Sequence, residues 1–522
     1  MTVRRTLRGG PAGPGGYRAL EPGPGEQHGH RRDLADAPEQ IGDVLLTVAH
    51  LSDLHLCDAQ SPARAELLDR WADPDSPIHD ELEEVGSYRA QELLTAQVAE
   101  SMVQAVNAVE RGPVGDAAID LAVVTGDNTD NAHANELSWY LTVLEGGSLR
   151  PDSGDLTRWE GVADGEVDDE RFWHPETERS DLPRERYGFP RVSGLLDAAR
   201  APFDATGLRL PWLAVHGNHD RLLQGTVPAT GPLGTASTGQ LKLIALPPDW
   251  SSEAIVKLLV GLNDCDPEAL AALAAVQSRL VTADPRRRVV SRAEFVGAHF
   301  GPAAVPVGHG FTEANRSEGV AYYRHDRGRV TILVLDTVNE NGGWQGSLDV
   351  GQLSWLDKQL TAADAEKRYV VLASHHPLGT LVNPTPGDGG EPRVLAAELG
   401  AVLDAHPCVV LWLNGHTHQT SVTPHRTWWE VTAPSLIDWP QQGRIVELLH
   451  SPGTLTVATT MLDHVGRAPW DDAVDSPEAL AGLGRELAAN DWQWRDLPLS
   501  RNPRAGGPDE RNVLLYLADP WA

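Results

Sequence analysis

Histidine and carboxylate side chains directly follow several apolar segments of this 522-residue chain. His416 and His418 follow the run that ends at Leu413, and Asp53 and His55 follow the run 44–49. In an extended segment, residues two apart point to the same side, so we expect each pair to present both side chains in one direction. Imidazole is a frequent metal ligand, and an imidazole next to a carboxylate suits a divalent metal. Either pair alone is weak evidence, because hydrogen-bonded loop histidines are about as common.

The same arrangement recurs after three more apolar runs. Polar donors tend to gather at the carboxyl ends of strands in layered α/β folds. Together with the two pairs above, the donors named below are more than one metal ion needs. The sequence therefore predicts two metals that share one carboxylate. The further donors are Asp127 after the run 121–125, Asn218 and His219 after the run 212–215, and His375 and His376 after the run 369–373.

Short apolar strands and amphipathic helices are expected to position these donors, which indicates an α/β protein. We predict strands at residues 44–49, 121–125, 212–215, 330–335, 369–373, 408–413, 428–432, 444–449 and 454–460. We predict helices at residues 88–109, 135–144, 252–259, 266–280, 352–360 and 393–405.

Composition shifts divide the chain into an arm, a domain and a tail. Residues 1–40 are rich in glycine and proline and are expected to be irregular, although Tyr17, Arg18 and Leu20 look like anchors. One domain is expected over 41–465, and the last residues, 466–522, are expected to form a tail packed on it. The domain carries two insertions, at about 146–206 and 221–328, which we expect to lie over the site and form its wall.

The net charge of −31 predicts that the protein repels nucleic acid and anionic membranes at long range. No apolar run approaches the length of about 18 residues that a membrane span needs. Cys57, Cys265 and Cys408 are few and far apart, which favours a reducing cytoplasm over a disulfide framework. Arg4 and Arg5 lack a following apolar segment, so a twin-arginine export signal is not expected.

Taken together, five motifs resemble those of the calcineurin-like metallophosphoesterases, and the large insertions resemble a bacterial subgroup of that superfamily. The resemblance covers about residues 44–449 without the two insertions and implies a four-layer α-β-β-α sandwich. In chain order the motifs are Asp53-x-His55, Gly126-Asp127-x-x-Asp130, Gly217-Asn218-His219-Asp220, His375 before Pro377, and Gly415-His416-x-His418.

The resemblance also implies a role for each donor. His375 is preferred to His376, because the ligand of the family usually lies two residues before the proline. His219 would protonate the leaving oxygen or stabilise its charge. Asp130 stands where purple acid phosphatases have a tyrosine, which argues against a tyrosinate-bound ferric ion. One metal would be held by Asp53, His55, Asp127 and His418, and the other by Asp127, Asn218, His375 and His416.

Two cations about 3.5–4 Å apart can clamp a phosphoryl group and activate a shared water. Manganese, iron and zinc all accept the mixed nitrogen and oxygen donors expected here. We therefore expect a hydrolase that acts on small phosphodiesters. A phosphomonoesterase is the alternative within the same chemistry, and a catalytically silent binding protein of the same fold is the alternative from another class. The sequence leaves the oligomeric state open.

Overall fold

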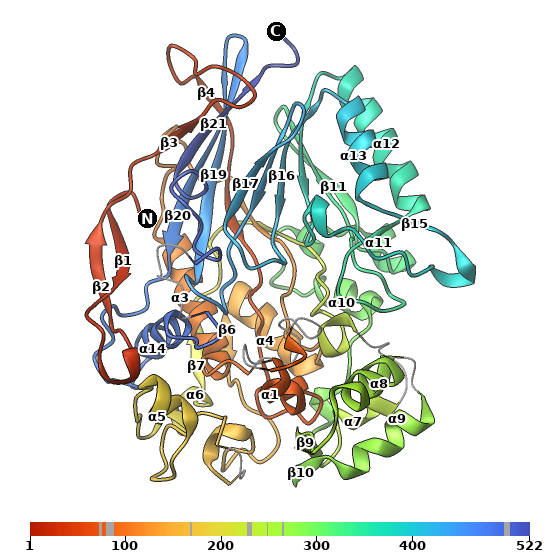
Figure 1. The fold of residues 1–522 in the computed structure, drawn as a ribbon. Helices are drawn as coiled ribbons and strands as arrows, with labels where there is room; N and C mark the ends of the chain where they lie inside the picture. Colours follow the sequence, from red (N-terminus) through yellow and green to blue (C-terminus); the bar gives the residue numbers. More distant parts are fainter. Residues whose placement is uncertain are drawn as a thin grey trace.

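A computed structural model describes residues 1–72, 76–79, 88–166, 170–226, 232–247, 249–263, 266–494 and 502–522. Two mixed β-sheets stand face to face within it (Figure 1). The seven-stranded sheet has the order β3-β21-β20-β19-β4-β5-β8. Its strands are β3 (Gly29–Arg31), β4 (Asp43–Leu51), β5 (Leu121–Val124), β8 (Trp212–Ala214), β19 (Gln442–Ser451), β20 (Thr454–Asp463) and β21 (Val513–Ala518).

The second sheet has six strands in the order β11-β12-β14-β16-β18-β17. Its strands are β11 (Tyr323–Arg327), β12 (Val330–Val334), β14 (Tyr369–Ala373), β16 (Val409–Asn414), β17 (Ser421–Pro424) and β18 (Trp429–Thr432). In the first sheet β4, β5 and β8 run parallel, and in the second β12, β14, β16 and β18 do. The donor motifs follow β4, β5, β8, β14 and β16, so each sheet delivers its donors at the carboxyl end of its parallel strands.

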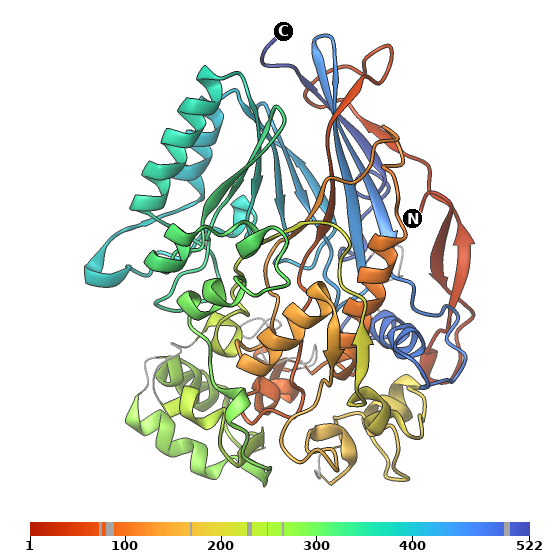
Figure 2. The same cartoon turned by 180° about the vertical axis from the view of Figure 1, so that it is seen from behind.

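Helices cover the outer face of each sheet, which completes a four-layer α-β-β-α sandwich, as expected (Figure 2). On the six-stranded sheet, α12 (Val350–Ala365) and α13 (Ala396–Ala405) bury Leu356 and Leu399 in one cluster with Leu372 and Trp412. On the seven-stranded sheet lie α3 (Thr95–Asn107), α4 (Ala134–Glu145) and α14 (Pro477–Ala489). The buried apolar residues between the sheets form the largest core cluster.

Three predicted helices are wrong in part. The predicted helix 266–280 ends at Ala272 as α9 (Pro267–Ala272), because residues 277–280 instead form β10 (Gln277–Leu280) and pair with β9 (Leu241–Ala245). The predicted helix 88–109 begins only at Thr95, after a one-turn 3₁₀ helix. The predicted helix 393–405 starts at Ala396, because β15 (Arg393–Val394) pairs with β13 (Leu348–Asp349).

Most of the small elements that the insertions form lie toward the end of the molecule opposite the chain's C-terminus (Figures 1 and 2). The first insertion contains β6 (Gly147–Leu149), α5 (Leu182–Tyr187), α6 (Leu195–Ala199) and β7 (Phe203–Ala205). The second adds α7 (Pro232–Ala236), α8 (Ser252–Asn263), α10 (Arg292–Ala298) and α11 (Glu313–Glu318) to β9, α9 and β10, while α1 (Asp69–Ala72) precedes both. Phe295 and Val296 of α10 join the central core, so the second insertion also supports the fold.

The expectation of an irregular arm over residues 1–40 is wrong, because this segment forms strands. β1 (Arg5–Gly9) pairs with β2 (Leu20–Pro24), and β3 pairs with β21. Pro22 and Pro24 fit β2 because N–H groups two residues apart point to the same edge, so the prolines remove donors from one edge only. The expected anchors make contacts: the Tyr17 hydroxyl donates to Glu486, the Arg18 amide donates to Asn490, and Leu20 is buried.

The expected tail, residues 466–522, also contributes regular structure. Its segments α14 and β21 belong to the outer helix layer and to the seven-stranded sheet. Cys57 and Cys408 are free and buried, whereas Cys265 lies outside the described residues. Among the described residues, no helix is long and apolar enough to cross a membrane.

Candidate metal centre

Left-handed backbone turns position most of the donor side chains. Asp53, His55, Asp127, His416 and His418 all have positive φ, between 45° and 69°. The prediction that each donor pair lies in an extended segment is wrong, because β4 and β16 end before their motifs begin. Non-glycine residues rarely adopt this conformation, and such strain tends to gather at functional sites.

Glycines permit the close approach of the two sheets at these turns. A Cβ atom on Gly126, whose φ is +93°, would lie 2.6 Å from His375 Nδ1. A Cβ on Gly415 would lie 1.8 Å from Ser52 Oγ. Both distances are far inside van der Waals contact, so these positions bring the motifs of the two sheets together only as glycine.

One group of donors, which we call cluster B, joins Asn218, His375 and His416 to Asp127 Oδ1. Asn218 Oδ1 lies 2.9 Å from His375 Nε2 and 3.0 Å from His416 Nδ1. His375 Nε2 lies 3.2 Å from Asp127 Oδ1. The Nδ1–H of His375 donates to the Thr125 carbonyl and the Asn218 amide donates to the Gln224 carbonyl, so the inward-facing atoms are lone-pair donors.

A second group, cluster A, joins Asp53, His55 and His418 to Asp127 Oδ2. His55 Nε2 lies 3.1 Å from His418 Nε2 and 3.7 Å from Asp127 Oδ2. His418 Nε2 lies 3.5 Å from Asp53 Oδ1. All four residues of this cluster are buried. The Nδ1 atoms of both histidines bond to carboxylates, at Asp130 and Asp438, so their Nε2 lone pairs face each other.

The donor atoms of both clusters fit divalent cations, because lone pairs that face one another about 3 Å apart repel unless a cation lies between them. Burial alone would lower the pKa of His375, but Asp127 outweighs it and raises that pKa to about 9. The pKa of His418 is likewise raised to about 9 against burial, by its bonds to Asp438 and Asp53. Positive charge is thus favoured at this place, and the donor set fits two divalent metal ions.

His376 has no lone pair left for a metal. Its Nε2–H donates to the Trp344 carbonyl at 2.9 Å, and its Nδ1 accepts from the Thr337 hydroxyl at 2.8 Å. His376 lies close to His375 and His416, so proximity alone would also admit it as a donor. The bonded state of its two nitrogens favours His375, in agreement with the spacing before Pro377.

Comparisons with known proteins agree with this geometry. No family profile matches the chain. The chain is 35% identical over 79 residues to a manganese-dependent ADP-ribose/CDP-alcohol diphosphatase of Xenopus tropicalis, a match that covers 15% of this chain and 21% of that protein. The Xenopus laevis protein of the same name is 33% identical over 81 residues, covering 15% of this chain and 20% of its own length. The chain thus spans about a fifth of the length of the curated relatives it matches.

Besides these sequence matches, the chain contains five motifs whose side chains lie around one carboxylate, Asp127. In these motifs and in their arrangement, the chain is similar to the calcineurin-like metallophosphoesterases. A solved dimetal phosphatase of Danio rerio aligns with 81% of this chain and 98% of its own, at 12% identity and a TM-score of 0.38. That likeness is too distant to carry an argument.

His219 lies beside cluster A without joining either group of inward-facing donors. Its Nδ1–H donates to the Asp130 carbonyl at 3.0 Å, and its Nε2 lies 3.9 Å from Asp127 Oδ2. Burial would lower the pKa of His219, but Asp127 and Asp130 outweigh it and raise that pKa. A protonated ring with its free N–H near the metal centre suits the role expected from the sequence.

Two carboxylates that sequence reasoning missed hold the centre in place. Asp438 accepts from His418 Nδ1 at 2.5 Å and lies 2.9 Å from Arg89 Nε and 3.1 Å from Arg504 Nη1. Asp220 ties the turn after β8 to the turn after β5, because it accepts from the amides of Gly217 and Thr129. Asp220 closes the recognised Gly-Asn-His-Asp motif, whereas no local signal marks Asp438.

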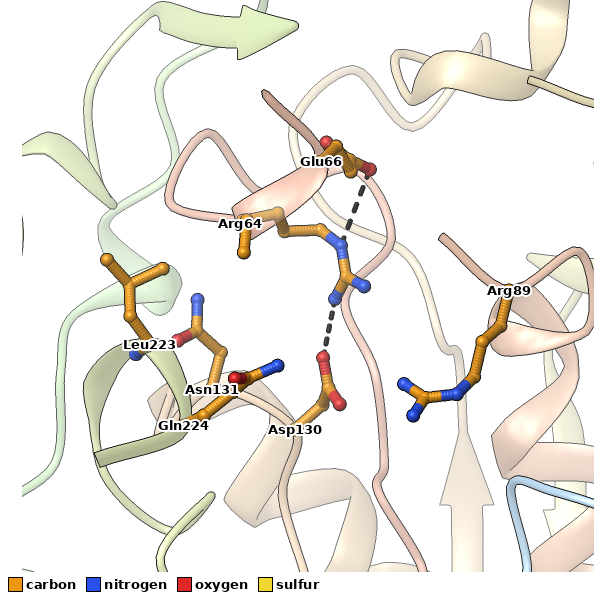
Figure 3. Close-up of a pocket in the computed structure, with 8 residues that line it drawn as sticks. Arg64, Glu66, Arg89, Asp130, Asn131, Leu223 and Gln224 are labelled. Carbon is orange, nitrogen blue, oxygen red and sulfur yellow. Dashed lines mark hydrogen bonds and ion pairs between the residues drawn. The ribbon is translucent and has the colours of Figure 1, made fainter. Parts of the chain in front are cut away.

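A narrow opening next to the centre is lined by Arg64, Ala65, Glu66, Arg89, Asp130, Asn131, Leu223 and Gln224 (Figure 3). Arg64 bonds to Asp130 at 2.6 Å, and Asp130 in turn bonds to His55. The second insertion supplies Leu223 and Gln224, but the first supplies none of these lining residues. Described residues of the first insertion, among them Trp173 and Phe189, pack into a separate cluster. Among the described residues, the second insertion therefore contributes to the lining of this opening and the first does not.

Proposed function

We propose that this protein is a metal-dependent hydrolase that acts on small phosphodiesters, among them diphosphate diesters. The observation that carries the proposal is the convergence of two donor clusters on the two oxygens of Asp127. The printed name of the Xenopus relatives adds support, because ADP-ribose and CDP-alcohols carry a substituent on both phosphates. The assignment of Asp53, His55, Asp127, Asn218, His375, His416 and His418 as ligands belongs to this proposal.

Two bound divalent metals would supply a water of lowered pKa and positive charge for the phosphoryl oxygens. The chain's own residues then have separate tasks. Asp127 presents one oxygen to each cluster, while its Oδ1 also accepts from the His219 amide at 2.8 Å. Asp127 and Asp130 raise the pKa of His219 against the effect of burial, so they favour the protonated ring, which carries a proton on Nε2 as well as the Nδ1–H that donates to the Asp130 carbonyl. From that position the ring can donate to the leaving oxygen.

The wall of the opening favours a diester over a monoester. A monoester carries about two negative charges near pH 7, and a diester carries one. The two arginines that line the opening are already ion-paired, Arg64 with Asp130 and Arg89 with Asp438. Glu66, which also lines the opening, is paired with Lys242 at 2.6 Å and with Arg64 at 3.4 Å. The described wall therefore offers little surplus positive charge for the doubly charged phosphoryl group of a monoester. Each phosphoryl group of a phosphodiester or of a diphosphate diester carries one charge and is the better match.

Metal analysis of the purified protein, followed by paired assays, tests the proposal. We expect about two transition-metal ions per chain. We also expect faster hydrolysis of bis-p-nitrophenyl phosphate than of p-nitrophenyl phosphate, and loss of both activities with chelator. Faster hydrolysis of p-nitrophenyl phosphate than of bis-p-nitrophenyl phosphate would identify the protein as a phosphomonoesterase instead. Full metal occupancy without turnover of either ester, or of ADP-ribose, would instead identify a binding protein.

A further inference from the structure

A large cavity lies between the N-terminal hairpin and the body of the molecule, apart from the metal centre. It has about 840 Å³ of space open to water-sized molecules, within the usual size range of small-molecule sites. The hairpin β1–β2 stands beside α14 in both views (Figures 1 and 2). The hairpin lines the cavity with Leu7, Arg8 and Arg18, and the body lines it with Trp439, Asn490 and Arg511.

The lining is positively charged, although the chain as a whole carries −31. Arg8, Arg18 and Arg511 line the cavity, and Glu26 supplies the one carboxylate among the lining residues. Glu26 pairs with Arg511 at 2.9 Å. The side chain of Arg18 donates to the Gly10 carbonyl and has no carboxylate partner among the described residues. Arg8 lies 3.8 Å from Glu21 in an exposed ion pair, so within the described part of the chain Arg18 is unpaired and Arg8 only loosely paired. These two guanidinium groups face the cavity in a protein whose net charge repels anions at long range.

The floor of the cavity is apolar. Trp439, Ala489 and Ala505 line it and belong to one buried cluster with Leu20, against which Leu7 packs. A site with an apolar floor and a few charged groups at its rim is typical of pockets that bind small molecules. The floor suits a flat or aliphatic body, and the arginines suit an anionic group attached to it.

We propose that this cavity binds a small anion with an apolar body, and that its occupancy alters metal binding at the centre. Two lining residues of the cavity are sequence neighbours of residues that support the metal centre. Trp439 lines the cavity and follows Asp438, which bonds to His418. Ala505 lines the cavity and follows Arg504, which pairs with the same Asp438. A ligand that moves Trp439 or Ala505 would therefore move Asp438 or Arg504, which hold His418 in its orientation. This coupling between the cavity and the metals rests on the proposed metal centre.

The binding step is tested with the fluorescent anion 8-anilino-1-naphthalenesulfonate, which combines a sulfonate with an apolar aromatic body. The charge-reversed variant Arg8→Glu/Arg18→Glu should bind it about tenfold more weakly, the scale for reversing two exposed charges. The matched control Arg4→Glu/Arg5→Glu reverses two exposed arginines next to the cavity lining and should bind it like the unaltered protein. Equal affinity of both double variants would overturn the site.

A variant without a charge change separates shape from charge. Ala12→Trp introduces a bulky side chain at an exposed lining position and should also weaken probe binding, with an unchanged melting temperature. Adenosine 5′-monophosphate and octanoate, each tested for displacement of the probe, distinguish a phosphate from a carboxylate as the favoured anionic group. If Ala12→Trp binds the probe normally, the probe lies elsewhere and the site is wrong.

The coupling is tested by titrating Mn²⁺ with and without saturating probe. Manganese affinity should change by about fivefold or more, and manganese should change probe affinity by the same factor. In Arg8→Glu/Arg18→Glu at the same probe concentration the shift should disappear. An unchanged manganese isotherm alongside normal probe binding would overturn the coupling. Absence of manganese binding altogether would contradict the proposed function, while the probe isotherm would still decide on the cavity.

Discussion

The two donor clusters share Asp127 but differ in what stands behind their histidines. In cluster A, His55 and His418 each bond through Nδ1 to a carboxylate, Asp130 and Asp438. In cluster B, His375 bonds to the backbone carbonyl of Thr125, and His416 stacks on Trp344 with ring centroids 5.8 Å apart. A carboxylate behind a ligating histidine makes the ring a stronger donor, which a neutral carbonyl does less well.

The proposed ligands themselves differ in the same direction. Cluster A has the carboxylate of Asp53 where cluster B has the neutral amide of Asn218. More negative charge, from Asp53 and from the carboxylates behind both histidines, favours tighter cation binding in cluster A. We therefore expect one metal to be held firmly at cluster A and the other to exchange more readily at cluster B, and each variant below tests part of this contrast.

The largest effect is expected for Asp127→Asn, which removes the charge that both clusters share. Both metals should bind weakly, and nearly all hydrolysis should be lost, because neither cluster keeps its bridging carboxylate. Metal content by mass spectrometry and a bis-p-nitrophenyl phosphate assay measure the two losses together. Retention of two metals in this variant would contradict the shared role of Asp127.

A pair of neighbouring substitutions tests the membership of cluster B. His375→Asn should lose the more exchangeable metal and most of the activity, whereas the metal of cluster A stays. His376→Asn serves as the matched control, because both of its ring nitrogens bond within the protein, and it should keep both metals. If His376→Asn loses a metal and His375→Asn keeps its normal metal content, His376 is the ligand and His375 is not.

His219→Asn tests a side chain that we place outside both clusters. It should keep both metals and lower turnover by roughly 10² to 10⁴, the usual scale for one general acid. The loss should be larger for an alkyl ester than for a phenyl ester, because a good leaving group needs little protonation. If metal and activity fall together, His219 is a ligand. Equal losses with both esters would instead indicate that it stabilises the phosphoryl oxygens.

The structure brings together the residues that the sequence predicted as donors, because each lies within a few residues of an apolar strand and within a recognisable motif. Their role as metal ligands stays a prediction. The positions of the central strands along the chain also follow from that pattern, and the four-layer sandwich that the resemblance implied is confirmed. The order of the strands within each sheet was not predicted. The limits of the domain at residues 40 and 465 stay a prediction. The mechanism by which paired donors converge could not be read from spacing, because it depends on left-handed turns at Asp53 and His416 rather than on extended strands.

The missed features are those that depend on long-range contacts. β3 and β21 lie at opposite ends of the chain and pair only after the sheet has formed, so neither the proline-rich arm nor the tail signalled a strand. β10 replaced the end of a predicted helix because it pairs with β9, more than thirty residues earlier. Asp438 is twenty residues from His418, and only the folded chain brings them together.

The smallest effect is expected for Asp438→Asn, which tests why the clusters differ. Asparagine can still accept from His418 Nδ1, so the ring keeps its orientation but loses the negative charge behind it. Manganese should bind about 10–100-fold more weakly at cluster A and with unchanged affinity at cluster B, so the contrast between the two sites shrinks or reverses.

A two-step titration followed by calorimetry measures both affinities. Asp364→Asn is the matched control, because Asp364 bonds to His406 at 2.6 Å on the outer helices, away from the centre. If Asp438→Asn titrates like this control, carboxylate backing does not explain the difference, and the charge of Asp53 against the amide of Asn218 must account for it alone.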